Sequence, residues 1–446
     1  MTGGADLAGL FKVLGAGFAI DPAAAAVTLS LRSAARAVEA RELFYRALNG
    51  LEPHFSVFIE GLPYCFMPDA WDHVLYRRKT GRAYKAVSQC ASCALSGFCP
   101  GVVAGGPFAR ELEKELKPVL PLPREVVFEL TKRCNQACRC CFSDRTLKEP
   151  PLKKIEAQLR KAAALGVKDI RFTGGEPFLS SSLLPLLKTA KKLGCYTLVN
   201  TNAAAPAGLY AEAAPFMDNV LVSLQGSDQA SDEAATATPG LFGRKLANMR
   251  LLRRTVPVFR LGTVASRNLI KNFKACHALA ARLNADVWEI YRPMLADGSA
   301  AGPEFDLGPK DLTGLSARIS ALKPGGPRVL LANPLPLCLV PEDERKNLLG
   351  AAFDDGHTRL VYDLRGFYKP SYYIAENLGK GIKEAWRSAY MKDLRSFYRR
   401  PGGCRDCRYL LKCLSGSRAL AKARGGSWFE EDPWLPAKIK TKNSRA

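Results

Sequence analysis

The sequence is poor in histidine and has no long apolar run. Its four histidines are His54, His73, His277 and His357, and none has a spacing typical of a metal site or a catalytic triad. Because no stretch of about 18 apolar residues is present, we expect no membrane-spanning helix. The most apolar segment, residues 7–20, lacks the positively charged start of a secretory signal. We therefore expect a cytoplasmic protein that uses thiolate rather than imidazole chemistry.

The charge balance is strongly basic. Lysine and arginine total 65 against 42 acidic residues, which gives a formal net charge of +23. Cysteine thiolates and bound iron–sulfur clusters would lower this to roughly +18. Such a charge is compatible with RNA, with an acidic peptide, or with solubility alone. The hydrophobic content of 47% excludes a disordered chain.

Cysteine is abundant, with fourteen residues. Cytoplasmic thiols are kept reduced, so disulfides are not expected and clustered spacing indicates metal binding. Cys195 and Cys276 are isolated and fit buried small apolar side chains. Eleven others fall into three groups, one central and two flanking.

Residues 124–334 alternate between β-rich and helical segments. This rhythm predicts an α/β fold with a parallel sheet, here a partial (β/α)6 barrel, because six units are too few for a closed eight-fold barrel. Chemistry in such folds lies at the carboxyl ends of the strands. The expected strands are 126–130, 168–173, 196–200, 219–224, 256–263 and 286–291, and the expected helices are 153–165, 183–193, 206–214, 242–254, 272–283 and 309–322.

The central group is Cys134, Cys138 and Cys141, directly after the first expected strand. Three thiolates on one tight loop can hold three irons of a 4Fe–4S cluster, which leaves the fourth iron open to a small molecule. A structural zinc loop is the alternative. The sequence therefore predicts a catalytic cluster at the start of the barrel.

These cysteines, with residues at the following strand ends, resemble the radical S-adenosylmethionine (SAM) superfamily. The resemblance implies an enzyme that cleaves SAM reductively and abstracts hydrogen from a substrate. Glu176, in a glycine-rich run after the second strand, can accept from the SAM ammonium. The SAM-contacting positions implied by the resemblance are Gly174, Gly175, Glu176, Pro177, Asn202, Ser223 and, more weakly, Asn268.

Two residues depart from the family pattern. Cys140 stands where members often carry an aromatic residue or histidine, which puts the adenine contact in doubt and offers a competing thiol. Gln225 stands where many peptide-modifying relatives have aspartate, which weakens any inference about the substrate.

The two flanking groups repeat one spacing, with gaps of two and five residues between three cysteines and a lone cysteine upstream. We interpret this as an internal duplication in which each quartet holds one metal centre. Four thiolates suit zinc as well as an iron–sulfur cluster. The quartets are Cys65, Cys90, Cys93 and Cys99, and Cys338, Cys404, Cys407 and Cys413.

The C-terminal quartet resembles the SPASM and twitch extensions of radical SAM enzymes, which carry auxiliary 4Fe–4S clusters. Residues 377–379 and 382–386 match the connecting pattern of those extensions. Ser371 and Ser417 stand near positions that are cysteine in full SPASM domains, so one cluster is expected here. With one cluster in each flank, the chain would hold one catalytic and two auxiliary clusters.

The expected domains are an N-terminal region, 1–123, with a cysteine-rich segment at about 50–105, the radical SAM partial barrel at 124–334, and the SPASM/twitch-like domain at 335–418. The final part, 419–446, is expected to be a basic tail whose last residues after Gly425 are solvated. The aromatic stretch from Tyr362 to Tyr373 is expected to form a hairpin core for the cluster domain rather than a substrate platform.

The SPASM resemblance implies an oxidoreductase acting on a peptide or protein side chain, reduced by a donor such as flavodoxin or ferredoxin. The basic charge leaves RNA or nucleotide modification open as an alternative. A non-catalytic electron carrier is a third possibility, but a carrier has no need for the glycine-rich SAM motif. The fold alone does not select the substrate.

Overall fold

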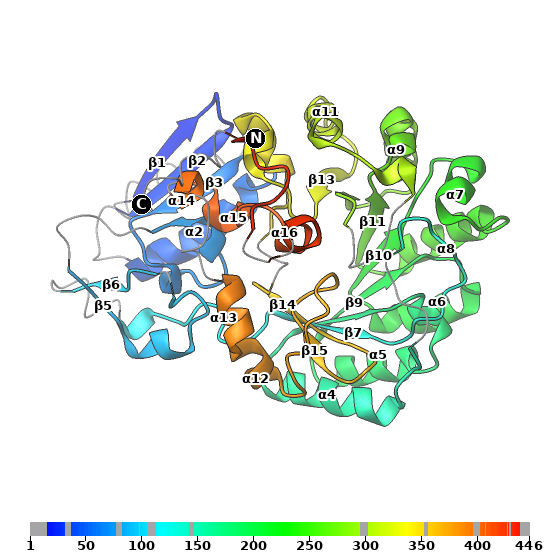
Figure 1. Ribbon diagram of the computed structural model, residues 1–446, viewed down its shortest axis with the longest axis horizontal. Coiled ribbons are helices and arrows are strands. Elements are labelled where there is room, and N and C mark those ends of the chain that lie inside the picture. The colour runs from blue at the N-terminus through cyan, green and yellow to red at the C-terminus, as the bar shows by residue number, and fades with distance from the viewer. Residues whose placement is uncertain are drawn as a thin grey trace.

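The computed structural model describes most of the chain, in twelve segments. The two largest sheets in these segments are a four-stranded sheet near the N-terminus and a nine-stranded sheet in the predicted βα region (Figure 1). The described residues are 16–31, 37–76, 83–97, 99–104, 113–141, 147–294, 302–351, 356–395, 402–405, 407–425, 427 and 430–437.

The nine-stranded sheet contains all six predicted strands, each within two residues of its expected bounds. These strands pair in parallel in chain order, as the βα rhythm predicts. Their interior runs are almost continuously apolar, which is typical of strands covered on both faces. The strands are β7 (Glu125–Glu129), β8 (Asp169–Thr173), β9 (Tyr196–Thr201), β10 (Asn219–Ser223), β11 (Val258–Val264) and β12 (Val287–Tyr291).

The six predicted helices also form and line the outer side of the sheet (Figure 1). In the first of them Ile155, Leu159 and Ala162 are buried, at the i, i+4, i+7 spacing of an amphipathic helix. Sequence analysis missed two short helices, α7 (Gln229–Thr236) and α9 (Arg267–Lys271). The predicted helices are α4 (Leu152–Ala164), α5 (Leu183–Lys192), α6 (Ala207–Ala213), α8 (Phe242–Thr255), α10 (Phe273–Arg282) and α11 (Pro309–Ser320).

Three further strands extend the sheet at its two ends. β13 (Arg328–Ala332) pairs in parallel with β12, and β14 (Arg359–Tyr362) pairs in parallel with β7. β15 (Tyr368–Lys369) then closes an antiparallel hairpin with β14. The strand order among the described residues begins at β13 and ends at β15, so the sheet is an open, partial barrel, and the predicted fold class is confirmed.

The β14–β15 hairpin forms an aromatic core, as predicted for this stretch, but this core packs on the barrel sheet and not within a cluster domain. The rings of Tyr362 and Tyr368 lie 5.1 Å apart between centroids, and Tyr362 also packs on Phe128 of β7 at 5.8 Å. For Tyr372 and Tyr373 the hairpin-core prediction is wrong, because both side chains line a central cavity. Tyr372 and Tyr373 follow β15, which is the last strand at this end of the sheet among the described residues, so no further strand there packs beside them.

The N-terminal sheet has the order β1-β2-β3-β4. Its helix, α2 (Ala37–Leu51), buries Leu43, Phe44 and Ala47 in one cluster with apolar residues of β2 and β3. A small hairpin of β5 (Tyr84–Lys85) and β6 (Val102–Val103) flanks the first cysteine quartet. The four strands are β1 (Ala16–Asp21), β2 (Ala26–Leu31), β3 (Ser56–Glu60) and β4 (Val74–Leu75).

Short 3-10 helices fill the connections of both regions. The ones that bear on the site are η2 (Tyr64–Phe66), η4 (Ser88–Ser92), η5 (Pro177–Leu179) and η8 (Leu337–Leu339). Beyond the barrel the chain is helical, with α12 (Ile382–Arg387), α13 (Ala389–Arg395), α14 (Gly402–Arg405), α15 (Leu410–Cys413) and α16 (Arg418–Gly425).

The expectation that residues after Gly425 are solvated is wrong for residues 430–437. Asp432 is fully buried, and both of its carboxylate oxygens accept from the guanidinium of Arg292, at 2.8 and 3.1 Å. The same guanidinium lies 3.9 Å from the ring centroid of Trp434. A buried arginine at the end of β12 requires an acidic partner, and the C-terminal segment supplies it. The basic residues 438–446 lie outside the described residues.

Cys195 and Cys276 are buried, with 4% and 3% of their surface exposed, which confirms that they are small core residues. Within the part of the chain that the structure describes, no helix has both the length and the apolar character needed to cross a membrane.

Candidate functional site

The three central cysteines lie on one loop at the carboxyl end of β7. The N–H of Cys141 donates to the carbonyl of Cys138 at 3.1 Å, which closes a tight turn. The sulfur of Cys134 accepts from the backbone N–H of Gln136 at 3.4 Å and lies 3.7 Å from the amide nitrogen of Asn202. Such donors stabilise a thiolate, the form in which cysteine binds iron.

The thiols of this loop interact with one another electrostatically. Burial and the neighbouring thiols Cys140, Cys134 and Cys141 together raise the pKa of Cys138 to about 12. The pKa of Cys140 is also raised to about 12, mainly by burial and then by the neighbouring thiol of Cys141. The predicted ligands are thus gathered in one place together with Cys140, whose side chain lines the central cavity. Three thiols on one loop are the kind of ligand set that a 4Fe–4S cluster with one open iron uses.

The glycine-rich run after β8 packs directly against the cysteine loop. Gly175 donates to the carbonyl of Thr131 at 2.7 Å, and Glu176 donates to that of Arg133 at 2.8 Å. A Cβ on Gly175 would stand 2.2 Å from the Arg133 oxygen, and one on Gly174, at φ +154°, would stand 2.4 Å from the Thr131 oxygen. The glycines therefore allow the end of β8 to approach the loop backbone, whereas their predicted contact with SAM stays a prediction.

The Glu176 side chain is fully buried. Its carboxylate accepts from the Phe178 N–H at 3.1 Å, the Thr201 hydroxyl at 2.8 Å and the Asn202 N–H at 2.7 Å. Burial raises its pKa to about 7, and these donors limit the rise. Glu176 thus joins the ends of β8 and β9 beside the cysteine loop. Its predicted role as an acceptor for the SAM ammonium stays a prediction.

Asn202 lies against the cysteine loop, and its side chain also donates to Asn135 at 2.7 Å. Pro177 is buried at the start of η5. Ser223, at the end of β10, lines the central cavity. Asn268 is half-buried on α9 and accepts from Asn272 at 2.7 Å; it is absent from the described residues that line the cavity.

Helix α7, which sequence analysis did not predict, accepts hydrogen bonds from the backbone of the cysteine loop. Ala137 and Arg139 donate their N–H groups to the carbonyls of Thr236 and Ala235, each at 3.1 Å. The Asp228 carboxylate caps the helix by accepting from the Ser231 N–H at 2.9 Å. This Asp-x-x-Ser pattern was present in the sequence and is typical of a helix start.

A buried ion pair holds α7 to α8. The ammonium of Lys245 lies 2.6 Å from a carboxylate oxygen of Asp232, and the two side chains are 0% and 1% exposed. The same oxygen accepts from the Gln225 N–H at 3.3 Å, and the Gln225 side chain accepts from Val264 at 3.2 Å. Gln225, which stands where many peptide-modifying relatives have aspartate, lines the cavity and also joins the ends of β10 and β11.

The N-terminal quartet surrounds a small cavity of about 120 Å³. All four cysteines line this cavity, so the lone Cys65 lies near the other three. Burial and the thiols of Cys99, Cys93 and Cys90 together raise the pKa of Cys65 to about 12. The structure therefore brings together the four residues that the duplication grouped.

The C-terminal quartet is gathered in the same way. Burial and the neighbouring thiols Cys338, Cys407 and Cys404 raise the pKa of Cys413 to about 12. The Leu337 N–H, which lies 3.4 Å from the Cys413 sulfur, opposes this rise. Both lone cysteines lie in 3-10 helices that begin after a proline, η2 and η8.

The two triads share a backbone hydrogen-bond pattern. In each, the second cysteine donates to the carbonyl of the first, the residue three further on donates to the second, and the third cysteine donates to the residue four before it. A glycine of positive φ follows each triad. The matched bonds are Cys93 to Cys90 (3.2 Å), Ser96 to Cys93 (3.3 Å) and Cys99 to Leu95 (3.0 Å), and Cys407 to Cys404 (3.1 Å), Leu410 to Cys407 (3.1 Å) and Cys413 to Tyr409 (2.8 Å).

Among the described residues, no three Cys, His, Asp or Glu side chains form a group arranged to hold a metal ion. The chemistry of the thiol sets still fits iron–sulfur clusters, because soft thiolates grouped in threes and fours are their usual ligands.

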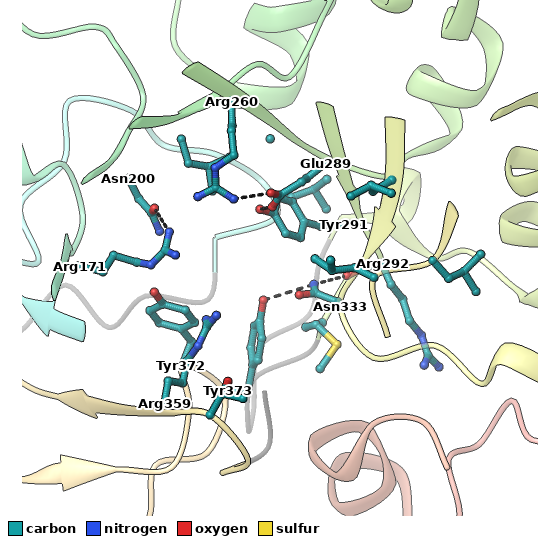
Figure 2. A pocket seen from close by; sticks show the side chains of 18 of the residues that line it. Arg171, Asn200, Arg260, Glu289, Tyr291, Arg292, Asn333, Arg359, Tyr372 and Tyr373 are labelled. Atoms are coloured by element: carbon teal, nitrogen blue, oxygen red, sulfur yellow. Dashed lines mark hydrogen bonds and ion pairs between the residues drawn. The ribbon is translucent and has the colours of Figure 1, made fainter. Parts of the chain in front are cut away.

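A central cavity of about 530 Å³ connects the cysteine loop with the interior of the barrel. Cys140, Thr173 and Ser223 line one part, and Trp71 and His73 of the N-terminal region line another. Figure 2 shows Arg260 and Glu289 pointing into this space opposite Arg359 and Tyr372. A cavity of this size is typical of a site for a small molecule or a short segment of a larger substrate.

Charged side chains inside the barrel form two linked groups. In one, Arg171 donates to both oxygens of Glu125, at 3.1 and 2.8 Å, while Arg359 lies 3.5 Å from the same carboxylate. Burial alone would raise the pKa of Glu125, but the two arginines hold it at about 2. In the other, Arg260 and Tyr291 donate to Glu289. Sequence analysis singled out none of these six residues.

Residues 128–267 match the family model of the Radical SAM superfamily. The chain is 27% identical over 188 residues to an AdoMet-dependent heme synthase of Nitratidesulfovibrio vulgaris, a match that covers 41% of this chain and 51% of that protein. It is 30% identical over 174 residues to a PqqA peptide cyclase of Gluconobacter oxydans, covering 38% and 49%. The chain thus spans about half the length of the curated relatives it matches.

Among solved structures, the fold is similar to SuiB of Streptococcus suis bound to the precursor peptide SuiA. The TM-score is 0.58 at 16% identity, with 70% of this chain and 76% of that chain covered. At this identity the likeness shows the fold alone.

Proposed function

We propose, from the match of residues 128–267 to the radical SAM superfamily, that the chain cleaves SAM reductively and abstracts a hydrogen atom from a peptide or protein side chain. Cys134, Cys138 and Cys141 hold the catalytic 4Fe–4S cluster in this proposal. When bound, that cluster supplies the electron that breaks the C5′–S bond of SAM.

The observation that carries the proposal is the junction of the cysteine loop with the end of β8. The loop backbone lies so close to Gly174 and Gly175 that neither position has room for a Cβ. Asn202, from the next strand end, reaches the same loop. Three independent segments thus meet beside a cavity, as a site for a small cofactor and a second reactant requires.

The protein's own contribution is positioning and shelter. Glu176 fixes the strand ends by accepting three hydrogen bonds. Ser223 lines the cavity at the position that contacts the SAM ribose in the family, and Asn268 is a weaker candidate for a similar contact. The barrel wall excludes water from the reacting atoms, which protects a radical from side reactions.

The two flanking quartets hold auxiliary 4Fe–4S clusters in this proposal, the C-terminal one in a SPASM/twitch-like domain. Their support is the shared backbone pattern of the two triads and the electrostatic coupling of four thiols in each set. The auxiliary clusters would accept an electron from the substrate radical or hold the substrate. A donor such as flavodoxin or ferredoxin would reduce the catalytic cluster.

The choice of a peptide substrate is supported by one relative, which is described as a peptide cyclase. The opposing observation is the net charge of +23, which would attract RNA. The proposed site itself is compatible with either, so the substrate class must be tested directly.

The test offers deuterium-labelled peptides and deuterium-labelled cellular RNA to the reconstituted full chain and measures deuterium in 5′-deoxyadenosine. Deuterium transferred from peptides supports the proposal.

A second measurement follows binding across a range of salt concentrations. Binding that neutralises several phosphates weakens by orders of magnitude between about 50 and 200 mM salt, whereas peptide binding depends on salt far less. Label from RNA alone, with steeply salt-dependent binding, would overturn the peptide assignment in favour of RNA modification.

A further inference from the structure

The loop after β7 carries four cysteines, one more than the proposed catalytic cluster uses. Cys140 stands between the proposed ligands Cys138 and Cys141, and the proposed function gives it no role. The N–H of Cys141 donates to the carbonyl of Cys138 at 3.1 Å, so Cys140 lies in one tight turn with both of them. A fourth thiol is therefore held on the same short segment as the proposed ligands.

The Cys140 thiol interacts with the other thiols of the loop. Burial is the largest cause of the raised pKa of Cys138, and Cys140 is the next largest, ahead of Cys134 and Cys141. After burial, Cys141 is in turn the largest cause of the raised pKa of Cys140. Because such electrostatic effects weaken with distance, the four thiols form one group to which Cys140 belongs.

Cys140 differs from the proposed ligands in what its side chain faces. It lines the central cavity, as does Thr173 at the end of β8. Cys134, Cys138 and Cys141, which the structure also describes, are not among the residues that line this cavity. In the proposed reaction SAM binds the fourth iron from the cavity, because the radical must form where the substrate lies. Cys140 is thus the loop thiol on the side from which the fourth iron is reached.

The Cys140 sulfur is available to bind a metal. Cys140 forms no disulfide and is half-buried. Within the described part of the chain, the hydrogen-bond donor that acts on its sulfur is its own backbone N–H. Thiolate is the usual protein ligand of iron in such clusters, and a cysteine side chain orders a single rotatable bond when it binds. A free thiol beside an open iron therefore competes with a small molecule for that iron.

From this placement we infer that Cys140 binds the fourth iron of the catalytic cluster when SAM is absent and that SAM displaces it. The inference rests on the proposed function and adds an exchangeable ligand to its site. In the exchange the iron–sulfur bond to Cys140 breaks, and bonds form from the iron to the amino nitrogen and a carboxylate oxygen of SAM. The SAM ammonium releases one proton and the departing thiolate takes up one, so the exchange needs no oxidant or reductant.

This exchange has two measurable consequences. A 4Fe–4S cluster whose fourth iron has no protein ligand readily loses that iron on oxidation and becomes a three-iron cluster, whereas a cluster with four thiolates retains it. The exchange also weakens the apparent binding of SAM, because SAM binds only molecules whose fourth iron is free of Cys140. If Cys140 held the iron in about 90% of the molecules, the apparent affinity for SAM would fall about tenfold.

The first experiment compares wild type, Cys140→Ala and Cys140→Val after anaerobic reconstitution of the full chain. Valine fills a space similar to that of cysteine but cannot bind iron, so it separates the loss of the thiol from a change of volume. Each protein is oxidised briefly with ferricyanide without SAM, and the three-iron cluster is quantified by electron paramagnetic resonance. Both variants are expected to form several-fold more three-iron cluster than wild type. Cys195→Ala, which removes a buried core thiol, is the matched control and should behave as wild type.

The second experiment measures SAM binding by equilibrium dialysis on the same proteins before they are reduced, a state in which SAM is not cleaved. Cys140→Ala and Cys140→Val are both expected to bind SAM several-fold more tightly than wild type, because no thiol has to be displaced. A gain in affinity does not arise from misfolding. If wild type forms as much three-iron cluster as both variants, or if both variants bind SAM no more tightly than wild type, the inference is overturned.

Production of 5′-deoxyadenosine from SAM is then measured on the reduced wild-type preparation. If iron-loaded wild type produces none, the proposed function fails. If it produces 5′-deoxyadenosine and the Cys140 variants match wild type in three-iron cluster and in SAM affinity, only the inference fails.

Discussion

The ion pair between Lys245 and Asp232 offers a sharp test of how the cysteine loop is supported. Lys245→Met keeps most of the side-chain length and removes the ammonium. Because the pair is 0% and 1% exposed, the Asp232 carboxylate would be left buried without its counter-ion. Breaking a buried pair in this way costs about 3–5 kcal/mol. We expect a correspondingly lower midpoint of urea unfolding, followed by circular dichroism.

The matched control is Lys191→Met, which breaks the pair with Asp218. That pair has a similar separation, 2.7 Å, but its side chains are 35% and 24% exposed. Exposed pairs contribute about 0–1 kcal/mol, so this variant should unfold close to the wild-type midpoint. Lys245→Met combined with Asp232→Leu removes both buried charges and should recover a large part of the lost stability.

Lys245→Met should also retain less iron than the wild type, because α7 carries the carbonyls that accept from the N–H groups of Ala137 and Arg139 in the cysteine loop. Iron per chain is measured after anaerobic reconstitution. An unfolding midpoint for Lys245→Met equal to that of Lys191→Met would refute the reasoning.

Three further predictions concern single positions. Gly175→Ala, with its Cβ 2.2 Å from the Arg133 oxygen, should lose about 1–3 kcal/mol and bind less iron, whereas Gly314→Ala, where a Cβ meets nothing within 4 Å, should do neither. Burial raises the pKa of Glu176 from 4.5 to about 7, so the folded state binds this proton more tightly than the unfolded state, and the free energy of unfolding falls as pH rises from 4.5 to 7. Glu176→Gln should therefore reduce the dependence of the unfolding midpoint on pH between about pH 5 and pH 8. An unchanged pH dependence would contradict this. Three clusters require about 12 iron and 12 sulfide per chain, and Cys65→Ala and Cys93→Ala should lose equal iron, whereas about four iron with two zinc would show zinc in the flanks.

The barrel strands could be predicted because each is a short apolar run followed by a helical pattern, and neighbours in the chain are neighbours in the sheet. β14 could not be assigned to the sheet in this way. It pairs with β7, more than 200 residues earlier, and its four residues carry no signal for a partner so distant. The short helix α7 was missed because eight residues give little periodicity.

The grouping of the cysteines could be predicted because the three cysteines of each triad are close in the chain and the two flanking triads repeat one spacing. Their role as cluster ligands stays a prediction. The charged barrel interior was missed, although the signal was present. Arg171 lies between Ile170 and Phe172, and Arg260 lies between Phe259 and Leu261, so each places one polar side chain on the inner face of an otherwise apolar strand. The acidic residues Glu52, Asp69 and Asp72 of the N-terminal region, in contrast, line the central cavity only because distant segments pack together, and no local sequence pattern predicts this.

The most direct test of the central claim measures 5′-deoxyadenosine formed from SAM by the reduced, anaerobically reconstituted full chain. We predict that wild type and Cys195→Ala, which alters a buried cysteine of the barrel core, produce it, and that Cys138→Ala does not. Equal production by Cys138→Ala, or none by iron-loaded wild type, would contradict the assignment of Cys134, Cys138 and Cys141 to a SAM-cleaving cluster.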